Sequence, residues 1–296
     1  MKIIVSLFLI LVQLSCNSNK KQNIQNDENK AVKTTYKLEL VWESDTLLKT
    51  PESVLIDRKN NILFVSCVNM NPWEKDGNGF ISKLDMNGNI QELKWIEGLN
   101  GPKGMGISGN SFFVADINTL VEANLESGEI INTIELEGNP DLNDITVSED
   151  GTVFVSGSGS NTIYKLQNGV LEEIHKGDEG ERFNGLLWEK DRMMLLTSAS
   201  SMFKEIPWES MEAKVISENM GHGDGIVALG DGSYITTSWQ GAIFHVSAKG
   251  EKTTLLETEA LGENAADLDY SKENETLYLP TFFKNQVKAY KLIKGE

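Results

Sequence analysis

The stretch from Asn143 to Ser158, NDITVSEDGTVFVSGS, decides the fold. It contains two short segments in which apolar residues alternate with small or polar ones, and Asp150-Gly151 stands between them. Alternation at every second residue is typical of a β-strand with one buried face, and an Asp-Gly pair is typical of a tight hairpin turn. The stretch therefore predicts two antiparallel strands joined by a tight turn.

The same form recurs along the chain, and its six copies begin at Glu52, Lys103, Asn143, Asn184, Asp224 and Ala266. Most of these first residues are 40 to 42 positions apart; one interval of 51 contains the insertion NMNPWEKDGNG at residues 69–79. A third and a fourth strand follow each pair, as in NTIYKLQNGVLEEIHK at residues 161–176. Four strands in a period near 40 residues are typical of a propeller blade, so the sequence predicts an all-β fold, a six-bladed β-propeller with four-stranded blades.

The two ends of the repeat region predict how the ring closes. The last period supplies only three strands and ends in VKAYKL at residues 287–292, whereas YKLELVWE at residues 36–43 belongs to no period. We expect this N-terminal strand to become the outer strand of the sixth blade, because closure removes an exposed sheet edge. The propeller domain is predicted over residues 35–296.

Charge and cysteine content exclude several classes of protein. The 296 residues include 27 Lys and Arg against 44 Asp and Glu, a formal net charge of −17. A surface this acidic repels phosphate backbones, so we expect no nucleic-acid partner. Cys16 and Cys67 are the only cysteines, which excludes a disulfide framework and a cysteine zinc site. The setting of Cys67, LFVSCVN, predicts a buried strand residue.

The first 15 residues predict a secretory signal. Met1-Lys2 is followed by an apolar run from Ile3 to Leu14, which is too short to span a bilayer as a helix. The run ends in Ser15-Cys16 and resembles a bacterial lipoprotein signal, in which Cys16 is lipidated; the alternative is a plain signal peptide. The polar residues 16–34 then form a tether. We expect an envelope lipoprotein that faces the periplasm and contacts the membrane only through its lipid anchor.

The first residues of the inner strands predict a metal site. Inner strands converge on one mouth of the central channel, where Glu52 and Asp224 would meet the amides of Asn143 and Asn184. Two carboxylates brought together at low dielectric repel, and a shared cation relieves the repulsion. Oxygen ligands suit a hard ion, so we expect one divalent metal, with Ca²⁺ as first choice and Mg²⁺, Zn²⁺ or Mn²⁺ as alternatives.

On these residues the sequence resembles the family of senescence marker protein, gluconolactonase and luciferin-regenerating enzyme, which are six-bladed propellers with one divalent metal. The resemblance covers roughly residues 36–293. Four motifs carry it, each at the start of the expected blade: Pro51-Glu52-Ser53, Asn143-Asp144, Asn184-Gly185 and Asp224-Gly225. The resemblance implies that Glu52, Asn184 and Asp224 bind the metal, that Asp224 is also the catalytic base, and that Asn143 contacts substrate or water.

The implied activity is hydrolysis of a small lactone or simple ester, with the metal polarising the carbonyl. Lys103 and His222 face the same mouth and are predicted to bind substrate. Two positions depart from the family pattern. Ser53 stands where a glycine is usual, and Asp141 stands where sugar lactonases have an arginine that holds substrate. The second departure leaves the metal site intact and argues against the same sugar-lactone pose.

Two functions remain open at this point. One is the metal-dependent hydrolase, and the other is a non-catalytic envelope propeller that binds a ligand or protein and uses the metal as a structural pin. The insertion at 69–79 could cover the channel mouth or lie on the opposite face, and its spacing does not decide between them.

Overall fold

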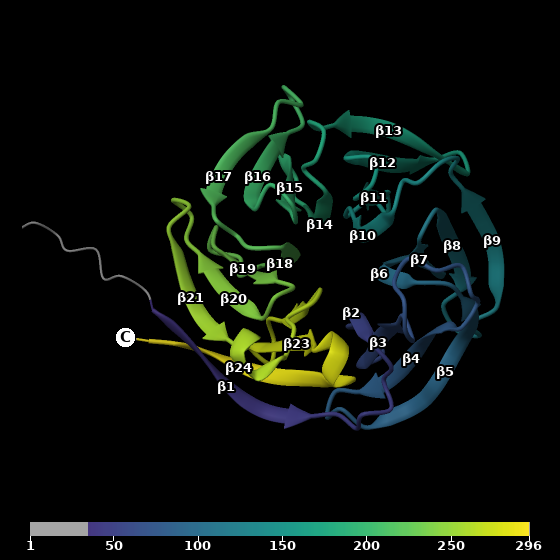
Figure 1. Cartoon of the computed structure of the whole chain (residues 1–296), viewed down its shortest axis with the longest axis horizontal. Coiled ribbons are helices and arrows are strands. Elements are labelled where there is room, and N and C mark those ends of the chain that lie inside the picture. The colour runs from purple at the N-terminus through teal and green to yellow at the C-terminus, as the bar shows by residue number, and fades with distance from the viewer. Residues whose placement is uncertain (1–34, 296) are drawn as a thin grey trace, which may run out of the picture. The chain divides into compact units, whose positions relative to one another are not determined.

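Residues 35–295, which the computed structural model describes, form six four-stranded antiparallel sheets around a central axis (Figure 1). The predicted six-bladed β-propeller is confirmed. In each blade the strand nearest the axis comes first in the sequence, except for the shared sixth blade. The predictions for residues 1–34, which include Cys16, lie outside the described residues. No helix within residues 35–295 is long and apolar enough to cross a membrane.

The first five blades each consist of four consecutive strands, of which the first lies nearest the axis and the last lies outermost. Blade one is β2 (Pro51–Asp57), β3 (Ile62–Cys67), β4 (Gly79–Asp85) and β5 (Ile90–Leu99). Blade two is β6 (Pro102–Ser108), β7 (Ser111–Asp116), β8 (Thr119–Asn124) and β9 (Ile130–Glu135). Blade three is β10 (Leu142–Val147), β11 (Val153–Gly157), β12 (Thr162–Gln167) and β13 (Val170–Lys176).

Blade four is β14 (Phe183–Trp188), β15 (Arg192–Thr197), β16 (Met202–Pro207) and β17 (Lys214–Glu218). Blade five is β18 (Gly223–Ala228), β19 (Tyr234–Ser238), β20 (Ala242–Val246) and β21 (Lys252–Glu257). Blade six is β22 (Asp269–Ser271), β23 (Thr276–Pro280), β24 (Val287–Lys294) and β1 (Tyr36–Glu43). Two single-turn 3₁₀ helices, η1 (Glu259–Leu261) and η2 (Phe282–Lys284), lie in loops.

The N-terminal strand closes the ring, as the repeat count predicts. β1 pairs antiparallel with β24, so that Tyr36 lies opposite Lys294 and Glu43 lies opposite Lys288. In Figure 1 the two strands run side by side along the outer edge of blade six. The pairing satisfies the backbone groups that β24 would otherwise expose along its whole length.

The innermost strand of blade six is shorter than the repeat predicts. The sequence pattern begins at Ala266, but β22 begins at Asp269. The reason is that Asp267 pairs with the neighbouring blade: it forms a parallel bridge with Ser53, and its N–H donates to the Glu52 carbonyl oxygen at 3.0 Å. The last inner strand thus fastens blade six to blade one near the axis.

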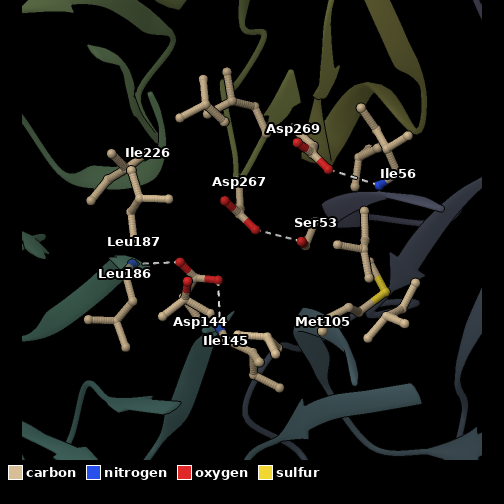
Figure 2. Close-up of a pocket in the computed structure, with 18 of the residues that line it drawn as sticks. Ser53, Ile56, Met105, Asp144, Ile145, Leu186, Leu187, Ile226, Asp267 and Asp269 are labelled. Carbon is tan, nitrogen blue, oxygen red and sulfur yellow. Dashed lines mark hydrogen bonds between the residues drawn. The ribbon is translucent and has the colours of Figure 1, made fainter. Parts of the chain in front are cut away.

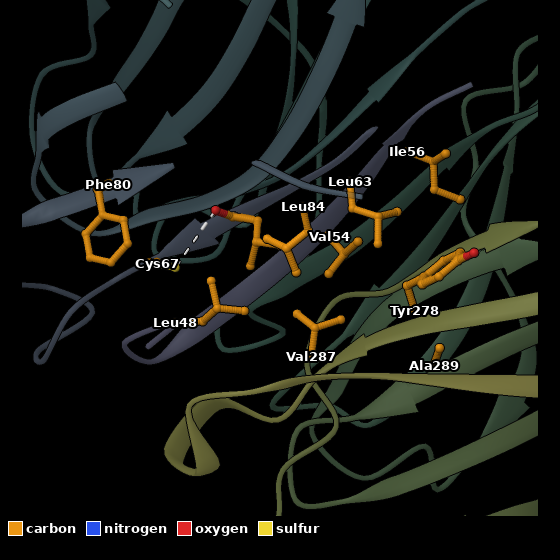
Figure 3. Close-up of a cluster of buried hydrophobic side chains, with 11 residues drawn as sticks. Leu48, Val54, Ile56, Leu63, Cys67, Phe80, Leu84, Tyr278, Val287 and Ala289 are labelled. Carbon is orange, nitrogen blue, oxygen red and sulfur yellow. Dashed lines mark hydrogen bonds between the residues drawn. The ribbon is translucent and has the colours of Figure 1, made fainter. Parts of the chain in front are cut away.

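The hydrophobic core is divided into six clusters, one between each pair of adjacent blades within the described residues. Figure 3 shows the cluster between blades six and one, where Tyr278 and Val287 pack against Leu48 and Val54. Cys67 belongs to this cluster and is fully buried, as predicted, and burial raises the pKa of its thiol to about 12. A thiol in this state is a packing residue and is unsuited to nucleophilic attack.

The ring closure can be tested through Trp42, which lies on β1. Its indole Nε1 donates to the Met86 carbonyl oxygen of blade one at 3.1 Å, and its ring lies 5.8 Å from that of Tyr278 in blade six. We expect Trp42→Ala to lower the free energy of unfolding by about 2 kcal/mol, because the contact with blade one and the contact within blade six are both lost. Urea denaturation measures the change.

The control is Leu40→Ala on the same strand, where the side chain is 52% exposed. This substitution should change the free energy of unfolding by no more than about 0.5 kcal/mol. Equal effects of the two substitutions would contradict the assignment of Trp42 to the seam.

Candidate functional site

A break in strand register positions the candidate site residues. In blades one to five, the pairing of the innermost strand with its neighbour shifts between the strand's first residue and a residue two or three positions later. A β-bulge of this kind removes residues from the ladder and turns their side chains. The residues released by the five shifts include Glu52, Lys103, Asn143, Asn184 and Asp224.

These five side chains meet in one cavity of about 420 Å³ at the mouth of the channel. All five are buried, and His222 lies exposed at the rim of the same cavity. The structure therefore brings together every described residue that the sequence analysis assigns to the site. It also places the insertion at 69–79 on this face, because Met70, Pro72 and Trp73 line the cavity.

Small residues after the bulges allow the inner strands to approach this closely. A Cβ on Gly185 would overlap the carbonyl oxygen of Asp224, and one on Gly225 would lie 2.7 Å from Oδ1 of Asp267. Ser53, which departs from the expected glycine, donates its hydroxyl to Oδ2 of Asp267 at 2.5 Å. The departure at Ser53 is thus explained by a hydrogen bond across the ring seam.

The three expected metal ligands each present an unsatisfied oxygen. Oε2 of Glu52, Oδ1 of Asn184 and Oδ1 of Asp224 are buried without a hydrogen-bond partner, and they are three of seven such side-chain atoms within residues 35–295. Leaving a buried acceptor unpaired costs about 1–3 kcal/mol. Three together point to a cation-binding site, and two carboxylates with one amide oxygen form a donor set that fits Ca²⁺ or Mg²⁺.

Three protein ligands are few for a metal site. Within the described chain no group of three or more His, Cys, Asp or Glu side chains is arranged to hold a metal ion. Glu52 and Asp224 would supply two acidic ligands, and Asn184 would supply a neutral one. Such a site leaves several coordination positions to water or substrate, as catalytic Mg²⁺ and Ca²⁺ sites do.

Burial shifts the charge states of the site. It raises the pKa of Glu52 to about 7, an effect that the positive charge of Lys103 opposes. It also raises the pKa of Asp224 well above its usual range; Glu52 and Asp267 add to that rise, whereas Lys103 and Asn184 oppose it. Burial lowers the pKa of Lys103, against the opposing effect of Glu52. Without a cation, the two carboxylates therefore favour their protonated forms.

Asn143 is held in place by its neighbours. Its Nδ2 donates to Oγ of Ser158 at 3.1 Å, and the Ser158 hydroxyl in turn donates to the carbonyl oxygen of Phe183. This bond uses one of the two N–H donors of the Asn143 amide and fixes its orientation in the cavity lining. His222 is fixed only through its backbone, since its N–H donates to Oε1 of Gln240 at 3.2 Å.

Other cavity residues come from loops and were not predicted as site residues. Trp239, Phe282 and Phe283 form an aromatic wall, with ring centroids 4.9 to 5.7 Å apart. Arg182 also lines the cavity. Arg182 stands two residues before Asn184, just as Asp141 stands two residues before Asn143. This shared spacing is the sequence signal that could have identified Arg182 as a site residue.

Arg182, which precedes blade four, lies close to Asp141, which precedes blade three. Arg182 Nη2 lies 4.0 Å from Asp141 Oδ2, and both residues have left-handed backbones, with φ of 52° and 49°. Thr50, two residues before Glu52, has the same conformation, with φ of 45°. The guanidinium expected at Asp141 from the family resemblance is therefore present at the same mouth, but it comes from the following blade.

A second hollow of about 310 Å³ lies further along the same inner strands (Figure 2). Its carboxylates already have partners in adjacent blades. Asp144 accepts from the Leu186 N–H at 2.6 Å, Asp267 accepts from Ser53, and Asp269 accepts from the Ile56 N–H at 2.9 Å. These acids connect blade three to blade four and blade six to blade one, which assigns them to the ring rather than to the site.

Comparisons with known proteins show the fold. No family model and no curated protein matches the sequence. Among solved structures, a gluconolactonase from Xanthomonas campestris superposes with a TM-score of 0.68 at 10% identity, over 88% of this chain and 96% of that one. A catalytically inactive variant of virginiamycin B lyase from Staphylococcus aureus, solved with quinupristin, superposes with a TM-score of 0.62 at 13% identity, over 88% and 100%. A putative gluconolactonase gives 0.66 at 12%, over 88% and 93%.

The buried acids predict how pH affects the metal-free protein. The pKa of Glu52 is raised to about 7 and that of Asp267 to about 8, in both cases chiefly by burial. The folded state then binds more protons than the unfolded state between the ordinary carboxyl pKa and these raised values. With a chelator present, the melting temperature should fall as pH rises from roughly 5 to roughly 9.

Asp267→Asn should flatten the upper part of this pH dependence, because the substituted side chain cannot ionise. Thermal melts of the two proteins across the same buffers measure the effect. A chelated protein whose melting temperature rises over that pH range, with or without the substitution, would contradict the assigned charge states.

Proposed function

We propose that the protein is a divalent-metal-dependent hydrolase that acts on a lactone or simple ester in the channel mouth. The observation that carries the proposal is the convergence of three buried, unpartnered oxygens from Glu52, Asn184 and Asp224 on one cavity. The family resemblance and the gluconolactonase fold neighbours support the same reading. The cavity, at about 420 Å³, has room for a small organic substrate.

Glu52, Asn184 and Asp224 would hold the ion, with Ca²⁺ as first choice. Its chemistry when bound is polarisation of the substrate carbonyl. Glu52 and Asp224 become ionised when their charges are compensated, which offsets the cost of burying them as carboxylates. Asn184 adds an oxygen without adding charge, so the two carboxylates balance a divalent ion.

Asp224 is the proposed general base. Its unpartnered Oδ1 and its place in the cavity lining allow it to accept a proton from an attacking water. As the carbon–oxygen bond to water forms, the bond from the acyl carbon to the ring or alkoxy oxygen breaks, and that oxygen takes up the proton. A carboxylate with a raised pKa is a stronger base than an exposed one, which suits this step.

Asn143 and Lys103 position the substrate in this scheme. The Asn143 amide is held by Ser158, so its remaining hydrogen-bonding groups can orient a hydroxyl or water. The Lys103 side chain lines the same cavity and can supply a positive charge. His222, exposed at the rim, is the proposed contact for the outer part of the substrate.

The test is hydrolysis of a panel of small lactones and esters with added Ca²⁺, Mg²⁺, Mn²⁺ or Zn²⁺. Asp224→Asn should lower kcat by about 10²- to 10⁴-fold, the usual contribution of a general base. Glu52→Gln should weaken metal binding, measured by calorimetry, because one of two negative ligands is lost.

Glu263→Gln is the matched control, since Glu263 is a buried carboxylate with an unpartnered Oε1 that lies outside the cavity. It should leave turnover within about twofold of the original protein. A protein that binds metal through Glu52 and Asp224 but hydrolyses nothing on the panel would favour the non-catalytic binding propeller. A folded protein that takes up no divalent metal would overturn the site assignment.

We also propose that Cys16 is lipidated and anchors the protein in a bacterial envelope, facing the periplasm. The support is the apolar run that precedes Ser15-Cys16. Cys16→Ser should move the protein from the membrane fraction to the soluble fraction and abolish incorporation of labelled fatty acid. Unchanged fractionation of the variant would favour the plain signal peptide.

A further inference from the structure

Lys103 is a buried cation without a carboxylate partner. Its side chain is 1% exposed, and its Nζ donates to the carbonyl oxygens of Pro72 at 3.1 Å and Gly101 at 3.5 Å. No carboxylate oxygen lies within 4.0 Å of it in the part of the chain that the structure describes. An ammonium has three donors, and the third finds no acceptor there. A buried charge left in this state is costly unless a ligand completes it.

Arg182 provides a second cation at the same wall. Its side chain is 43% exposed, and its one ion-pair partner among the described residues is Asp141, at the 4.0 Å limit of an ion pair. No described side chain accepts a hydrogen bond from its guanidinium. A guanidinium with a free planar fork is well suited to bind a carboxylate through two parallel hydrogen bonds.

Trp73 in the insertion lies close to both cations. Lys103 Nζ lies 4.2 Å from the centroid of the Trp73 ring, and the Arg182 Cζ lies 5.9 Å from it. The ring thus holds two positive groups from different blades near one point of the cavity. The insertion itself is attached near both ends, because the Met70 N–H donates to Thr50 Oγ1 at 3.0 Å and the Gly77 N–H donates to Asn100 Oδ1 at 3.2 Å.

The rest of the cavity lining includes an apolar part. Trp239, Phe282 and Phe283 form it, and Phe283 is 60% exposed. A ligand that fits both parts has an anionic group at one end and an apolar group at the other.

From this arrangement we infer that the substrate is an anion: a lactone or ester that also carries a carboxylate, bound by Lys103 and Arg182, and an apolar group, bound against the aromatic wall. The inference rests on the proposed function only where it calls the ligand a substrate. The binding of an anion by Lys103 and Arg182 does not depend on that function. Charge balance supports it. Glu52 and Asp224 would offset a divalent ion, and Asp116 and Asp141 act on Lys103 only from beyond ion-pair distance, so no carboxylate in contact with Lys103 remains to neutralise it.

The test is equilibrium binding of two probes of matched shape, 4-phenylbutyrate and its neutral amide, to the full chain by calorimetry. The original protein should bind the carboxylate at least about tenfold more tightly, which corresponds to one charge-assisted hydrogen bond. Lys103→Met and Arg182→Gln should each reduce that preference, and Lys103→Arg should retain part of it.

The control is Lys75→Met, because Lys75 belongs to the same insertion but lies outside the cavity, 3.7 Å from Glu135. It should keep the full preference. Equal binding of the two probes to the original protein would overturn the inference, and so would a preference that survives both cavity substitutions. If Lys103→Met does not melt cooperatively, Arg182→Gln decides the outcome.

Repeating the titration with a chelator separates the anion site from the metal. A preference that disappears with the chelator and is untouched by Lys103→Met would assign the carboxylate to the ion and overturn the inference. The two proposals fail separately. Hydrolysis of neutral esters without a carboxylate preference would retain the hydrolase alone, whereas a carboxylate preference without turnover would retain the anion site alone.

Discussion

The structure depends on how closely the inner strands approach the axis. Six strands converge there, and at Gly185 and Gly225 the neighbouring backbone leaves no space for a Cβ. The close approach breaks the strand register in five blades, because the first residues of each inner strand cannot remain in the ladder and also follow the axis. The bulge that relieves the crowding is also what turns Glu52 and Asp224 inward, so fold geometry and site geometry have one cause.

Crowding at the axis also buries acidic side chains, and this burial determines their pKa values. Four acids along the channel, Glu52, Asp144, Asp224 and Asp267, all have raised pKa values with burial as the largest cause. Asp144 and Asp267 are stabilised by hydrogen bonds from the next blade. Glu52 and Asp224 keep oxygens without partners. The difference separates acids that hold the ring together from acids that are free to bind a ligand.

The sequence predicted the features that repeat from blade to blade, but not the features that occur at one place only. The period near 40 residues, the Asp-Gly turns and the missing outer strand of blade six were sufficient for the fold, because each is a local pattern copied along the chain. Glu52, Asn184 and Asp224 could be placed at one mouth for the same reason, although their chemical roles remain predictions. Arg182 and Phe283 lie in loops of individual shape, and the side taken by the 69–79 insertion depends on contacts with Gly101 and Lys103 that no periodicity encodes. The predicted strand start at Ala266 was wrong because Asp267 pairs with another blade.

The pairing of β1 with β24 imposes an order on events during synthesis. The ribosome delivers the chain from its N-terminus, so β1 is the first described strand to emerge, yet its partner ends at Lys294. Tyr36 must therefore wait for almost the entire chain before its backbone groups can pair with those of Lys294. The nascent chain therefore carries β1 as an unpaired strand until β24 has been made. The five buried site residues, each from a different blade, are all synthesised before the ring can close.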